Sequence, residues 1–372
     1  MKIVTVIGAR PQFIKAAAVS RAIAAHNLAN SNLKVEEYIL HTGQHYDQNM
    51  SDVFFQELGL NQPDWQLHCG GIASHAKMHS EMLTGIEKAL MECRPDAVLV
   101  YGDTNSTFAG ALAAAQLRIP VLHVEAGLRS FNKQMQEEIN RILTDHLATM
   151  LFCPTRQAIQ NLANEGITEG LFNTGDVMYD AALTFGSVAE TKSDILSALG
   201  LHAGQYRLCT VHRAENTNNP EHLRQIIFAL VEIATSDCPV IFPVHPRTGF
   251  YLKSYNLLPV IESNEALRMI DPVDYTDMLM LEKNATTILT DSGGIQKEAY
   301  FFRTPCITLR DKTEWTETVA AGWNQIAGHQ TEKILECLAT TPEKSEIDDY
   351  GDGHAAEKIV NVIVKSHYNT GW

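Results

Sequence analysis

Short apolar runs rich in β-branched residues alternate along the chain with segments whose apolar positions recur every three or four residues. The runs have the length of buried strands, and the segments, such as the one from Met78 to Leu90, have the period of an amphipathic helix. The predicted strands are Ile3–Ile7, Val35–Leu40, Ala97–Val100, Val121–Val124, Met150–Phe152, Leu208–Val211, Val240–Val244, Thr287–Thr290 and Cys306–Leu309. Strands and helices that alternate in this way form parallel sheets with helices on both faces. The pattern therefore predicts an α/β protein.

The chain is 372 residues long, and at about 100–200 residues per domain this length predicts two domains. Residues 166–175 are rich in glycine and resemble a turn, and a polar helix is expected over Glu190–Leu199. We therefore place an N-terminal domain at residues 1–175 and a C-terminal domain at 176–354. An amphipathic helix is expected after them, at about residues 355–372. Two parallel-sheet domains with a cleft between them is the predicted architecture.

Composition narrows the possible classes. Hydrophobic residues make up 45% of the chain, but the longest apolar runs have the length of a strand, so no membrane insertion is expected. The seven cysteines are scattered without a CxxC pair, which is typical of a reducing compartment and favours the cytoplasm. No metal site is expected, because the pairs His41/His45 and His75/His79 have no third ligand nearby. A net charge of −15 disfavours nucleic acid as a partner but permits a small anionic ligand.

Charged and polar side chains follow most of the predicted strands. They are Asp103, Glu125, His212 with Arg213, His245 with Arg247, Asp291 with Ser292, and Arg310. Ligands of open α/β sheets bind beyond the carboxyl ends of the strands, where these residues are expected to lie. Taken singly, Asp103 or Asp291 could equally be a helix N-cap. The repetition of such residues in both halves of the chain favours a binding site.

The run DSGGIQKE at residues 291–298 takes a buried strand directly into a helix. Gly293 and Gly294 allow close approach of a ligand to the backbone, and the free N–H groups of the first helical turn favour an anion. With Ser292 they form a candidate diphosphate site, and Glu298, about one turn later, could accept the hydroxyls of a ribose. The alternative is a tight turn without a ligand. The run is not a P-loop, and Gly8–Pro11 is not the GxGxxG fingerprint of a dinucleotide site.

Two neighbouring carboxylates and an arginine begin a predicted helix at residues 137–141. Glu137 and Arg141 are four residues apart, so a solvent-exposed ion pair is the simplest interpretation of this spacing alone.

Several motifs identify the chain as similar to the non-hydrolysing UDP-N-acetylglucosamine 2-epimerases. They are GARPQFIKAA (8–17), TGQHYD (42–47), YGDTNST (101–107), HVEAGLRS (123–130), EEINR (137–141), TVHRAEN (210–216), PVHPR (243–247), DSGGIQKEA (291–299) and LRDKTEW (309–315). The resemblance covers residues 1 to about 325 in the family's order. It implies a GT-B-like fold of two Rossmann-like domains, an interdomain active site, and a last helix that packs back on the first domain. It also implies a homodimer and a place in surface polysaccharide synthesis.

The resemblance also implies the site residues. Ser292, Gly293, Gly294 and Glu298 correspond to the UDP clamp, while Arg10 and Lys15 correspond to cations near the diphosphate and sugar. Asp103, Glu125 and Glu137 correspond to the acid/base carboxylates, and Arg141 and His212 to groups that support them. Arg213, His245 and Arg310 are further candidate ligand-binding residues.

The chemistry of C2 inversion explains why such residues are needed. The C2 hydrogen is not beside a carbonyl group, so we expect loss of UDP from C1 to acidify it and to give a 2-acetamidoglucal. Carboxylates with different pKa values can then take and return the proton on opposite faces. No hydride moves, so no redox cofactor is expected.

The sequence departs from the family pattern at three places. Gln12 and Phe13 replace the usual Glu-Ala, and Trp315 stands where an arginine is usual. These changes resemble the subgroup that acts on UDP-2,3-diacetamido-2,3-dideoxyglucuronate, so this sugar and UDP-N-acetylglucosamine both remain candidate substrates. Lys133 could pair with the extra carboxylate of the former, or simply be solvated. Gln44 and His45 match the family's allosteric site only in part, which puts activation by substrate in question.

Other functions remain open at this point. A GT-B glycosyltransferase shares the fold and the nucleotide clamp, although a transferase needs only one base. A hydrolysing epimerase would release UDP and free sugar. A sensor of nucleotide sugars would bind UDP without catalysis.

Overall fold

The computed structural model describes residues 1–30, 32–44, 55, 58–72 and 74–370 of the chain. The chain forms two compact units. Unit 1 comprises Met1–Ala181 and Asp348–Trp372, and unit 2 comprises Ala182–Ile347. Among the helices of the described residues, none combines the length and hydropathy that a bilayer crossing requires.

Unit 1 is built on a seven-stranded parallel sheet of order β3-β2-β1-β4-β5-β6-β7. The strands are β1 (Lys2–Ile7), β2 (Glu36–His41), β3 (Trp65–Gln66), β4 (Ala97–Tyr101), β5 (Val121–Val124), β6 (Met150–Cys153) and β7 (Leu171–Asn173). The helices are α1 (Arg10–Ala29), α3 (His75–Cys93), α4 (Asn105–Gln116), α5 (Gln136–Leu147), α6 (Arg156–Asn164) and α17 (Ala355–Thr370), with a 3₁₀ turn at Asp348–Tyr350. With β1 at the centre, the order of the first six strands is that of a Rossmann fold.

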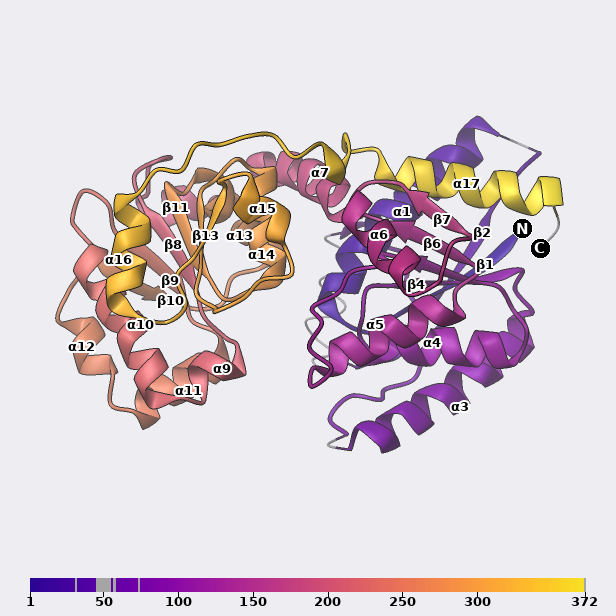
Figure 1. Ribbon diagram of the computed structural model, residues 1–372, viewed down its shortest axis with the longest axis horizontal. Coiled ribbons are helices and arrows are strands. Elements are labelled where there is room, and N and C mark those ends of the chain that lie inside the picture. Colours follow the sequence, from indigo (N-terminus) through magenta and orange to yellow (C-terminus); the bar gives the residue numbers. More distant parts are fainter. Residues whose placement is uncertain (31, 45–54, 56–57, 73, 371–372) are drawn as a thin grey trace. The chain divides into compact units, whose positions relative to one another are not determined.

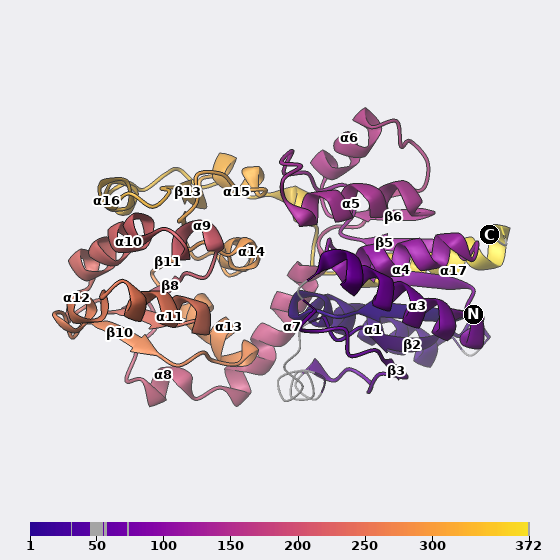
Figure 2. The ribbon, with the colours of Figure 1, turned by 90° about the horizontal axis from the view of Figure 1, so that it is seen from below.

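Alternation of side chains along the strands explains how this sheet is covered. Val4 and Val6 of β1 belong to one buried cluster with Val98 and Val100 of β4, and α3 and α4 cover that face. Helix α4 packs against α3 on one side and α5 on the other (Figures 1 and 2). On the other side α17 packs along α1 (Figure 1).

The first turn of α17 is held by a carboxylate from α7 (Val177–Lys192), the helix that runs from unit 1 into unit 2. Asp180 accepts hydrogen bonds from the backbone N–H groups of Ala355 (3.0 Å) and Ala356 (2.7 Å). These are the N–H groups that a helix leaves without an internal partner. Burial raises the pKa of Asp180 to about 6, although the two backbone hydrogen bonds lower it.

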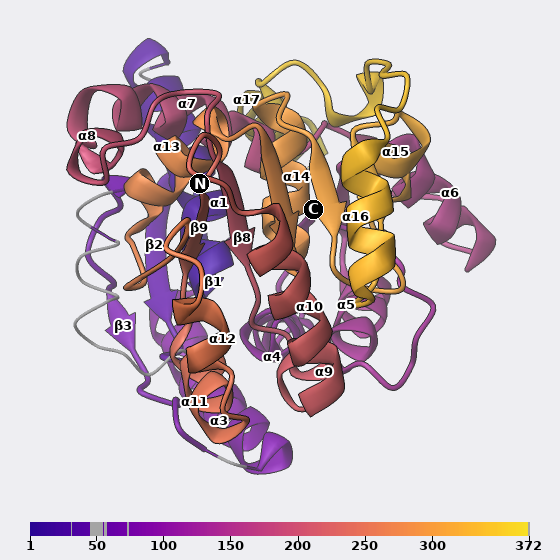
Figure 3. The same ribbon diagram turned by 90° about the vertical axis from the view of Figure 1, so that its left-hand side faces the viewer.

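Unit 2 repeats the same plan with a six-stranded parallel sheet of order β10-β9-β8-β11-β12-β13. The strands are β8 (Arg207–Thr210), β9 (Val240–Pro243), β10 (Leu267–Ile270), β11 (Thr287–Thr290), β12 (Cys306–Thr308) and β13 (Asn324–Ile326). The helices are α8 (Ile195–Ala198), α9 (Ala214–Thr217), α10 (Pro220–Ile233), α11 (Pro246–Ser254), α12 (Leu258–Glu262), α13 (Tyr275–Asn284), α14 (Gly293–Phe301), α15 (Thr316–Ala320) and α16 (Thr331–Ala339). Helices α10 and α16 lie side by side on one face of the sheet (Figure 3). On the other face the core is formed by α8, α13, α14 and the residues that flank them.

The predicted fold class is confirmed: both units are parallel α/β sheets, and each of the nine predicted strands corresponds to an observed strand within one or two residues. The sequence missed β3, β7, β10 and β13, which all lie at sheet edges. Two local predictions were wrong. Residues 166–175 contain β7 as well as turns, and the expected helix at Glu190–Leu199 is the end of α7, a break, and the short α8. The boundaries between the units fall at 181/182 and 347/348, where the sequence placed them at 175/176 and 354/355.

Candidate active site

In unit 1 the charged residues predicted to follow the strands gather at the carboxyl edge of the sheet. Asp103 lies just beyond β4, Glu125 just beyond β5, and Arg10 begins the helix that follows β1. Glu137 lies in the first turn of α5, and Lys15 and Arg141 project from α1 and α5. Ion pairs and electrostatic effects connect the two cations Lys15 and Arg141 with the three carboxylates.

Asp103 forms an ion pair with Arg141, and its backbone carbonyl accepts a hydrogen bond from Asn140 Nδ2 at 3.0 Å. Loss of hydration raises the pKa of Asp103, Arg141 opposes this, and the carboxylate of Glu125 adds to it. Two smaller effects follow: the Lys15 ammonium lowers the pKa of Asp103, and the Glu137 carboxylate raises it. The arginine of the EEINR motif thus neutralises Asp103, where the spacing alone had suggested a pair with Glu137.

Glu125 accepts a 2.6 Å hydrogen bond from the ammonium of Lys15, and both side chains are nearly buried. The backbone of Glu125 has φ = +70°, a left-handed conformation that is rare outside glycine. Such conformations cost roughly 1–3 kcal/mol and cluster at functional sites. This conformation is stabilised from β6, because the N–H groups of Glu125 and of the next residue, Ala126, both donate to the Phe152 carbonyl at 3.1 Å.

The two neighbouring glutamates of α5 have different environments. Glu138 is buried and accepts hydrogen bonds from Ser130 N and Phe131 N at 2.9 and 2.8 Å, so it stabilises the loop before the helix. Glu137 is half-buried and acts electrostatically on Asp103. The sequence alone could not separate these two roles. Lys133, in the same loop, is exposed.

Gln12, one of the departures from the family pattern, is a structural residue. Its side-chain oxygen accepts from the N–H groups of Gly8 and Ala9 at 2.9 and 3.1 Å, and its amide donates to Tyr101 O and Thr107 Oγ1 at 3.1 and 3.0 Å. The buried amide therefore ties the β1–α1 turn to β4 and α4. Phe13 packs on His41 in the same region, with ring centres 5.2 Å apart.

Near the partly matched allosteric motif, Gln44 accepts hydrogen bonds from Ser106 N and Oγ at 3.0 and 2.8 Å. Its side chain therefore binds the first turn of α4. His45, Tyr46 and Asp47 of this motif lie outside the described residues.

In unit 2, Asp291 is fully buried and organises the loop after β8. Its carboxylate accepts from the N–H groups of His212 (3.0 Å) and Arg213 (2.9 Å) and from Asn216 Nδ2 (3.0 Å). This carboxylate holds a neighbouring loop and does not cap its own helix α14. Arg213 is thereby placed at the start of α9, with its Nε buried and without a hydrogen-bond partner among the described residues.

Two histidines lie at this edge, with His212 and His245 ring centres 5.7 Å apart. Burial lowers the pKa of His212, and the cations Arg213 and Arg247 add to this effect while Asp291 opposes it. Burial and Arg247 also lower the pKa of His245, whose Nδ1 accepts the N–H of Arg247 at 3.1 Å as the cap of α11. Both rings are therefore neutral at neutral pH.

The serine-glycine turn starts α14, and Ser292 is its N-cap without a side-chain capping bond. A methyl group added to Gly293 would stand 2.5 Å from Glu314 Oε1 and 3.4 Å from Trp315 Nε1, so any larger residue would displace the Glu314 carboxylate. At Gly294 a methyl group would meet only Ser292 Oγ, at 3.9 Å. The backbone beside Gly294 is thus open, as close approach of an anion to the helix N-terminus requires.

Trp315 contributes a buried donor beside this turn. Its side chain is 5% exposed, and Nε1 has no hydrogen-bond partner among the described residues. The Lys297 ammonium lies 4.1 Å from the centre of the indole ring and is itself buried. Sequence reasoning singled out Trp315 as a departure but missed Lys297, because nothing in the local pattern of a helix distinguishes a buried lysine from a solvated one.

The two remaining predicted residues of unit 2, Glu298 and Arg310, both interact with other side chains of the protein. Glu298 is buried on α14 and accepts a hydrogen bond from the Tyr275 hydroxyl at 2.9 Å. Arg310 forms ion pairs with Glu215 (3.0 Å) and Glu314 (3.1 Å). Arg310 therefore counters the charge of Glu314, the carboxylate that lies next to Gly293.

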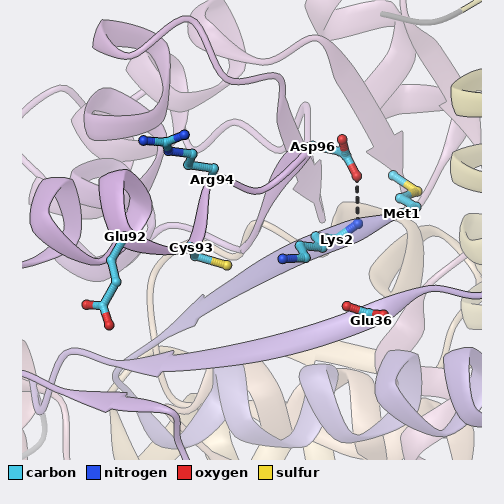
Figure 4. A pocket seen from close by; sticks show the side chains of 7 residues that line it. All are labelled: Met1, Lys2, Glu36, Glu92, Cys93, Arg94 and Asp96. Carbon is cyan, nitrogen blue, oxygen red and sulfur yellow. Dashed lines mark hydrogen bonds between the residues drawn. The ribbon is translucent and has the colours of Figure 1, made fainter.

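The amino edge of the unit 1 sheet has a separate depression of about 630 Å³ (Figure 4). It is lined by Met1, Lys2, Glu36, Glu92, Cys93, Arg94 and Asp96. The Lys2 N–H donates to Asp96 Oδ2 there at 2.7 Å. This edge is opposite to the one that carries Asp103 and Glu125, so the depression is separate from the candidate site.

Known proteins resemble the chain along its whole length. A family model described as UDP-N-acetylglucosamine 2-epimerase matches residues 26–364. A UDP-N-acetylglucosamine 2-epimerase homolog of Methanococcus maripaludis is 52% identical over 98% of this chain and 99% of its own. The UDP-2,3-diacetamido-2,3-dideoxy-D-glucuronate 2-epimerase of Pseudomonas aeruginosa is 47% identical over 98% of this chain and 100% of its own. The crystal structure of the Methanocaldococcus jannaschii UDP-GlcNAc 2-epimerase, in complex with UDP-GlcNAc and UDP, has a TM-score of 0.87 at 43% identity and covers 98% of this chain and 99% of that one.

Proposed function

Because this chain belongs to the UDP-N-acetylglucosamine 2-epimerase family, we propose that it inverts C2 of a UDP-linked N-acetylamino sugar. The family is one of epimerases, so the chain is an isomerase with a GT-B-like fold. The observation that carries the proposal is the group of three carboxylates, Asp103, Glu125 and Glu137, on the carboxyl edge of one sheet with two cations among them.

The proposed reaction is an elimination followed by an addition. A carboxylate takes the C2 proton, the electron pair of that bond forms a C1=C2 double bond, and the C1–O bond breaks to release UDP. Addition of UDP to C1 and of a proton to the opposite face of C2 gives the epimer, so atoms and electrons balance without an external oxidant or reductant. Each direction needs one proton acceptor and one proton donor on opposite faces of the ring.

The environments of the three carboxylates support such a division of roles. Loss of hydration raises the pKa of Asp103, which favours a carboxyl group that can hold and return a proton. The Lys15 ammonium is hydrogen-bonded to Glu125 and favours its ionised form as a proton acceptor. Glu137 is half-buried, acts electrostatically on Asp103, and is the third candidate. Arg141 stabilises the charge on Asp103 when it is ionised.

We assign the UDP group to the serine-glycine turn of unit 2. The first turn of α14 lacks a side-chain cap, so the N–H groups at Gly293 and Gly294 can bind a diphosphate whose charge develops as the C1–O bond breaks. Arg213, whose Nε is buried without a hydrogen-bond partner among the described residues, is a further candidate donor. Arg10 and Lys15 are the corresponding candidates in unit 1, and Glu298 is the candidate for the ribose hydroxyls. His212 and His245 are neutral, so they can donate hydrogen bonds without adding charge.

The sugar is either the N-acetylglucosamine type or its 2,3-diacetamido glucuronate relative. Trp315 supports the second, because its place in the LRDKTEW motif, where an arginine is usual, resembles the subgroup that acts on that sugar. The P. aeruginosa relative, named for that sugar, is 47% identical to this chain, and the M. jannaschii enzyme, named for UDP-N-acetylglucosamine, is 43% identical. The identities alone do not choose between the two, so the substrate is decided by experiment.

Proton NMR in heavy water tests the proposal directly. The protein is incubated with UDP-N-acetylglucosamine and, separately, with the UDP-diacetamidoglucuronate, without any acceptor. Loss of the C2 proton signal and growth of the manno-configured epimer with one of them support the epimerase. A glycosyltransferase would leave C2 unlabelled in the absence of an acceptor, a hydrolysing enzyme would accumulate free UDP and sugar, and a sensor would bind UDP without exchange.

A further inference from the structure

A chain of four ionisable side chains, three of them buried, lies directly behind the carboxylates of unit 1. It runs from His123 on β5 to Asp145 on α5, then to Arg129 in the loop between them, and ends at the exposed Glu165 after α6. The side chains of His123 and Asp145 are completely buried, and that of Arg129 is 1% exposed. Ionisable groups at this depth are costly unless each has a partner.

Every connection in this chain is short. His123 Nδ1 is 2.7 Å from Asp145 Oδ1, and His123 Nε2 is 2.7 Å from the Gly102 carbonyl oxygen. Asp145 Oδ2 accepts from Arg129 Nη1 at 2.7 Å and from the Gly127 N–H at 3.2 Å. Arg129 binds Glu165 through two parallel hydrogen bonds of 2.7 Å.

These partners fix the orientation of the imidazole. A carbonyl oxygen only accepts hydrogen bonds, so His123 Nε2 carries a proton toward Gly102. His123 Nδ1 faces Asp145 Oδ1, while Asp145 Oδ2 accepts hydrogen bonds from the arginine and from a backbone N–H. Both ring nitrogens therefore have fixed partners, and the ring cannot turn without breaking a buried hydrogen bond.

The peptide that this imidazole binds is the one that carries a proposed catalytic carboxylate. Gly102 precedes Asp103 and has φ = +64°, and a methyl group added to it would stand 3.3 Å from both Glu125 Oε1 and Lys15 Nζ. The Gly102 carbonyl thus fixes the backbone between the Lys15–Glu125 pair and Asp103. His123 itself lies two residues before Glu125 on the same strand.

We propose that His123, oriented by Asp145 and Arg129, is a positioning residue that fixes the Gly102–Asp103 peptide and so the geometry of the carboxylates at C2. It acts only through this peptide and not on the sugar or UDP. The proposal rests on the function proposed above, since it gives Asp103 a catalytic role. The hydrogen bond from His123 to Gly102, in contrast, can be tested independently of that function.

The hydrogen bond to Gly102 is tested by NMR on the full chain labelled with ¹⁵N-histidine. The ring signals of His123 are assigned in the wild-type protein through their correlations with its backbone, so the measurement does not depend on the folding of a variant. The Nε2 proton of His123 is expected to be observed and to be protected from exchange with solvent, because it is buried against the Gly102 carbonyl. An Nε2 without a proton, or an Nε2 proton that exchanges as fast as that of an exposed histidine, would overturn the proposal.

The positioning role is tested by steady-state kinetics of His123→Gln and Asp145→Asn with the substrate identified by the NMR experiment. Both variants are expected to lower kcat by about 10–100-fold with little change in KM, because misplacement of a reacting group by about 1 Å costs roughly that much. His202→Gln, the same change in an exposed histidine of unit 2, is the control and should retain wild-type kcat.

A kcat within about twofold of wild type in His123→Gln would overturn the positioning role, as would a rise in KM that accounts for the whole loss. Failure of the proposed function has a different signature. If Asp103→Asn keeps full activity, the catalytic role of Asp103 is wrong, whereas the protected Nε2 proton of His123 is measured independently of that role.

Discussion

The Lys297 ammonium lies 4.1 Å from the centre of the Trp315 indole ring, and both side chains are buried beside the turn that begins α14. A cation over the face of a tryptophan is stabilised by about 2 kcal/mol or more when water is excluded. The contact fixes the plane of the indole and leaves its Nε1 edge near Gly293. A side chain that departs from the family pattern is therefore held rigidly at the proposed nucleotide site.

Replacing Trp315 by phenylalanine should weaken UDP binding. Phenylalanine keeps an aromatic face for Lys297 but removes the unpartnered N–H, and a hydrogen bond to a charged group contributes about 1.5–3 kcal/mol. We expect the Kd for UDP, measured by calorimetry, to rise by about tenfold or more. Trp323→Phe is the control, because the Trp323 Nε1 already donates to Ser345 O at 2.8 Å and its loss should leave the Kd unchanged. An unaltered Kd in the Trp315 variant would exclude the indole as a ligand donor.

The glutamates at the start of α5 should separate catalysis from stability. Glu137→Gln is expected to lower the rate of C2 deuterium exchange by about 100-fold or more, as are Asp103→Asn and Glu125→Gln, since general acid/base groups contribute about 10²–10⁴-fold. Glu138→Gln should lower the free energy of unfolding by about 1–3 kcal/mol, because Glu138 binds Ser130 and Phe131 of the preceding loop. Full exchange activity in all of the first three variants would contradict the assignment.

Gly102→Ala tests the close approach between β4 and the carboxylates. Alanine at φ = +64° costs roughly 1–2 kcal/mol of stability, and its methyl group would also press on Lys15 and Glu125. We therefore expect a loss of kcat in addition to the loss of stability. Gly166→Ala has the matched backbone penalty at φ = +84° with nothing within 4 Å of the added methyl group. Equal activity in the two variants would show that the contact at Gly102 is without consequence.

Stability should fall in weak acid because of the histidines of unit 2. The pKa of His212 and of His245 is lower in the folded protein than the usual value of about 6.5. As pH falls through that value, the unfolded chain takes up protons that the folded protein does not, so this contribution is complete above it and is lost below it.

His245→Asn should make this dependence shallower, because asparagine still accepts the Arg247 N–H as an N-cap but does not titrate. The slope that one such group adds is at most about 1.4 kcal/mol per pH unit, and solvent near these rings reduces it. Urea unfolding between about pH 5 and pH 7.5 measures the slope. Parallel pH profiles for wild type and variant would contradict the prediction.

The inner strands of both sheets could be predicted from the sequence because each is a run of buried apolar residues. The edge strands could not, because β7, β10 and β13 are short and partly exposed, and two of them, Leu171–Asn173 and Asn324–Ile326, contain asparagine. Nothing in such a segment separates it from a loop until a neighbouring strand pairs with it.

At the site, local patterns located the residues but not their partners. The i,i+4 spacing of Glu137 and Arg141 suggested an ion pair within the helix. Arg141 of α5 instead forms its ion pair with Asp103, which lies beyond the end of β4. Asp291 looked like a possible helix cap and instead binds the loop after β8. In both residues the partner comes from a distant part of the chain, and only the assembled sheet brings the two together.

Because synthesis runs from the N-terminus, α17 is the last part of unit 1 to become available for folding. Unit 2 is one continuous segment, whereas unit 1 receives α17 only after all of unit 2 has been synthesised. Until Asp180 can bind the first turn of this helix, the face of α1 that it covers stays exposed to solvent. During translation unit 1 therefore cannot complete its fold until unit 2 has been synthesised. A chain that stops before residue 348 would expose the apolar surface of α1 and be prone to aggregation.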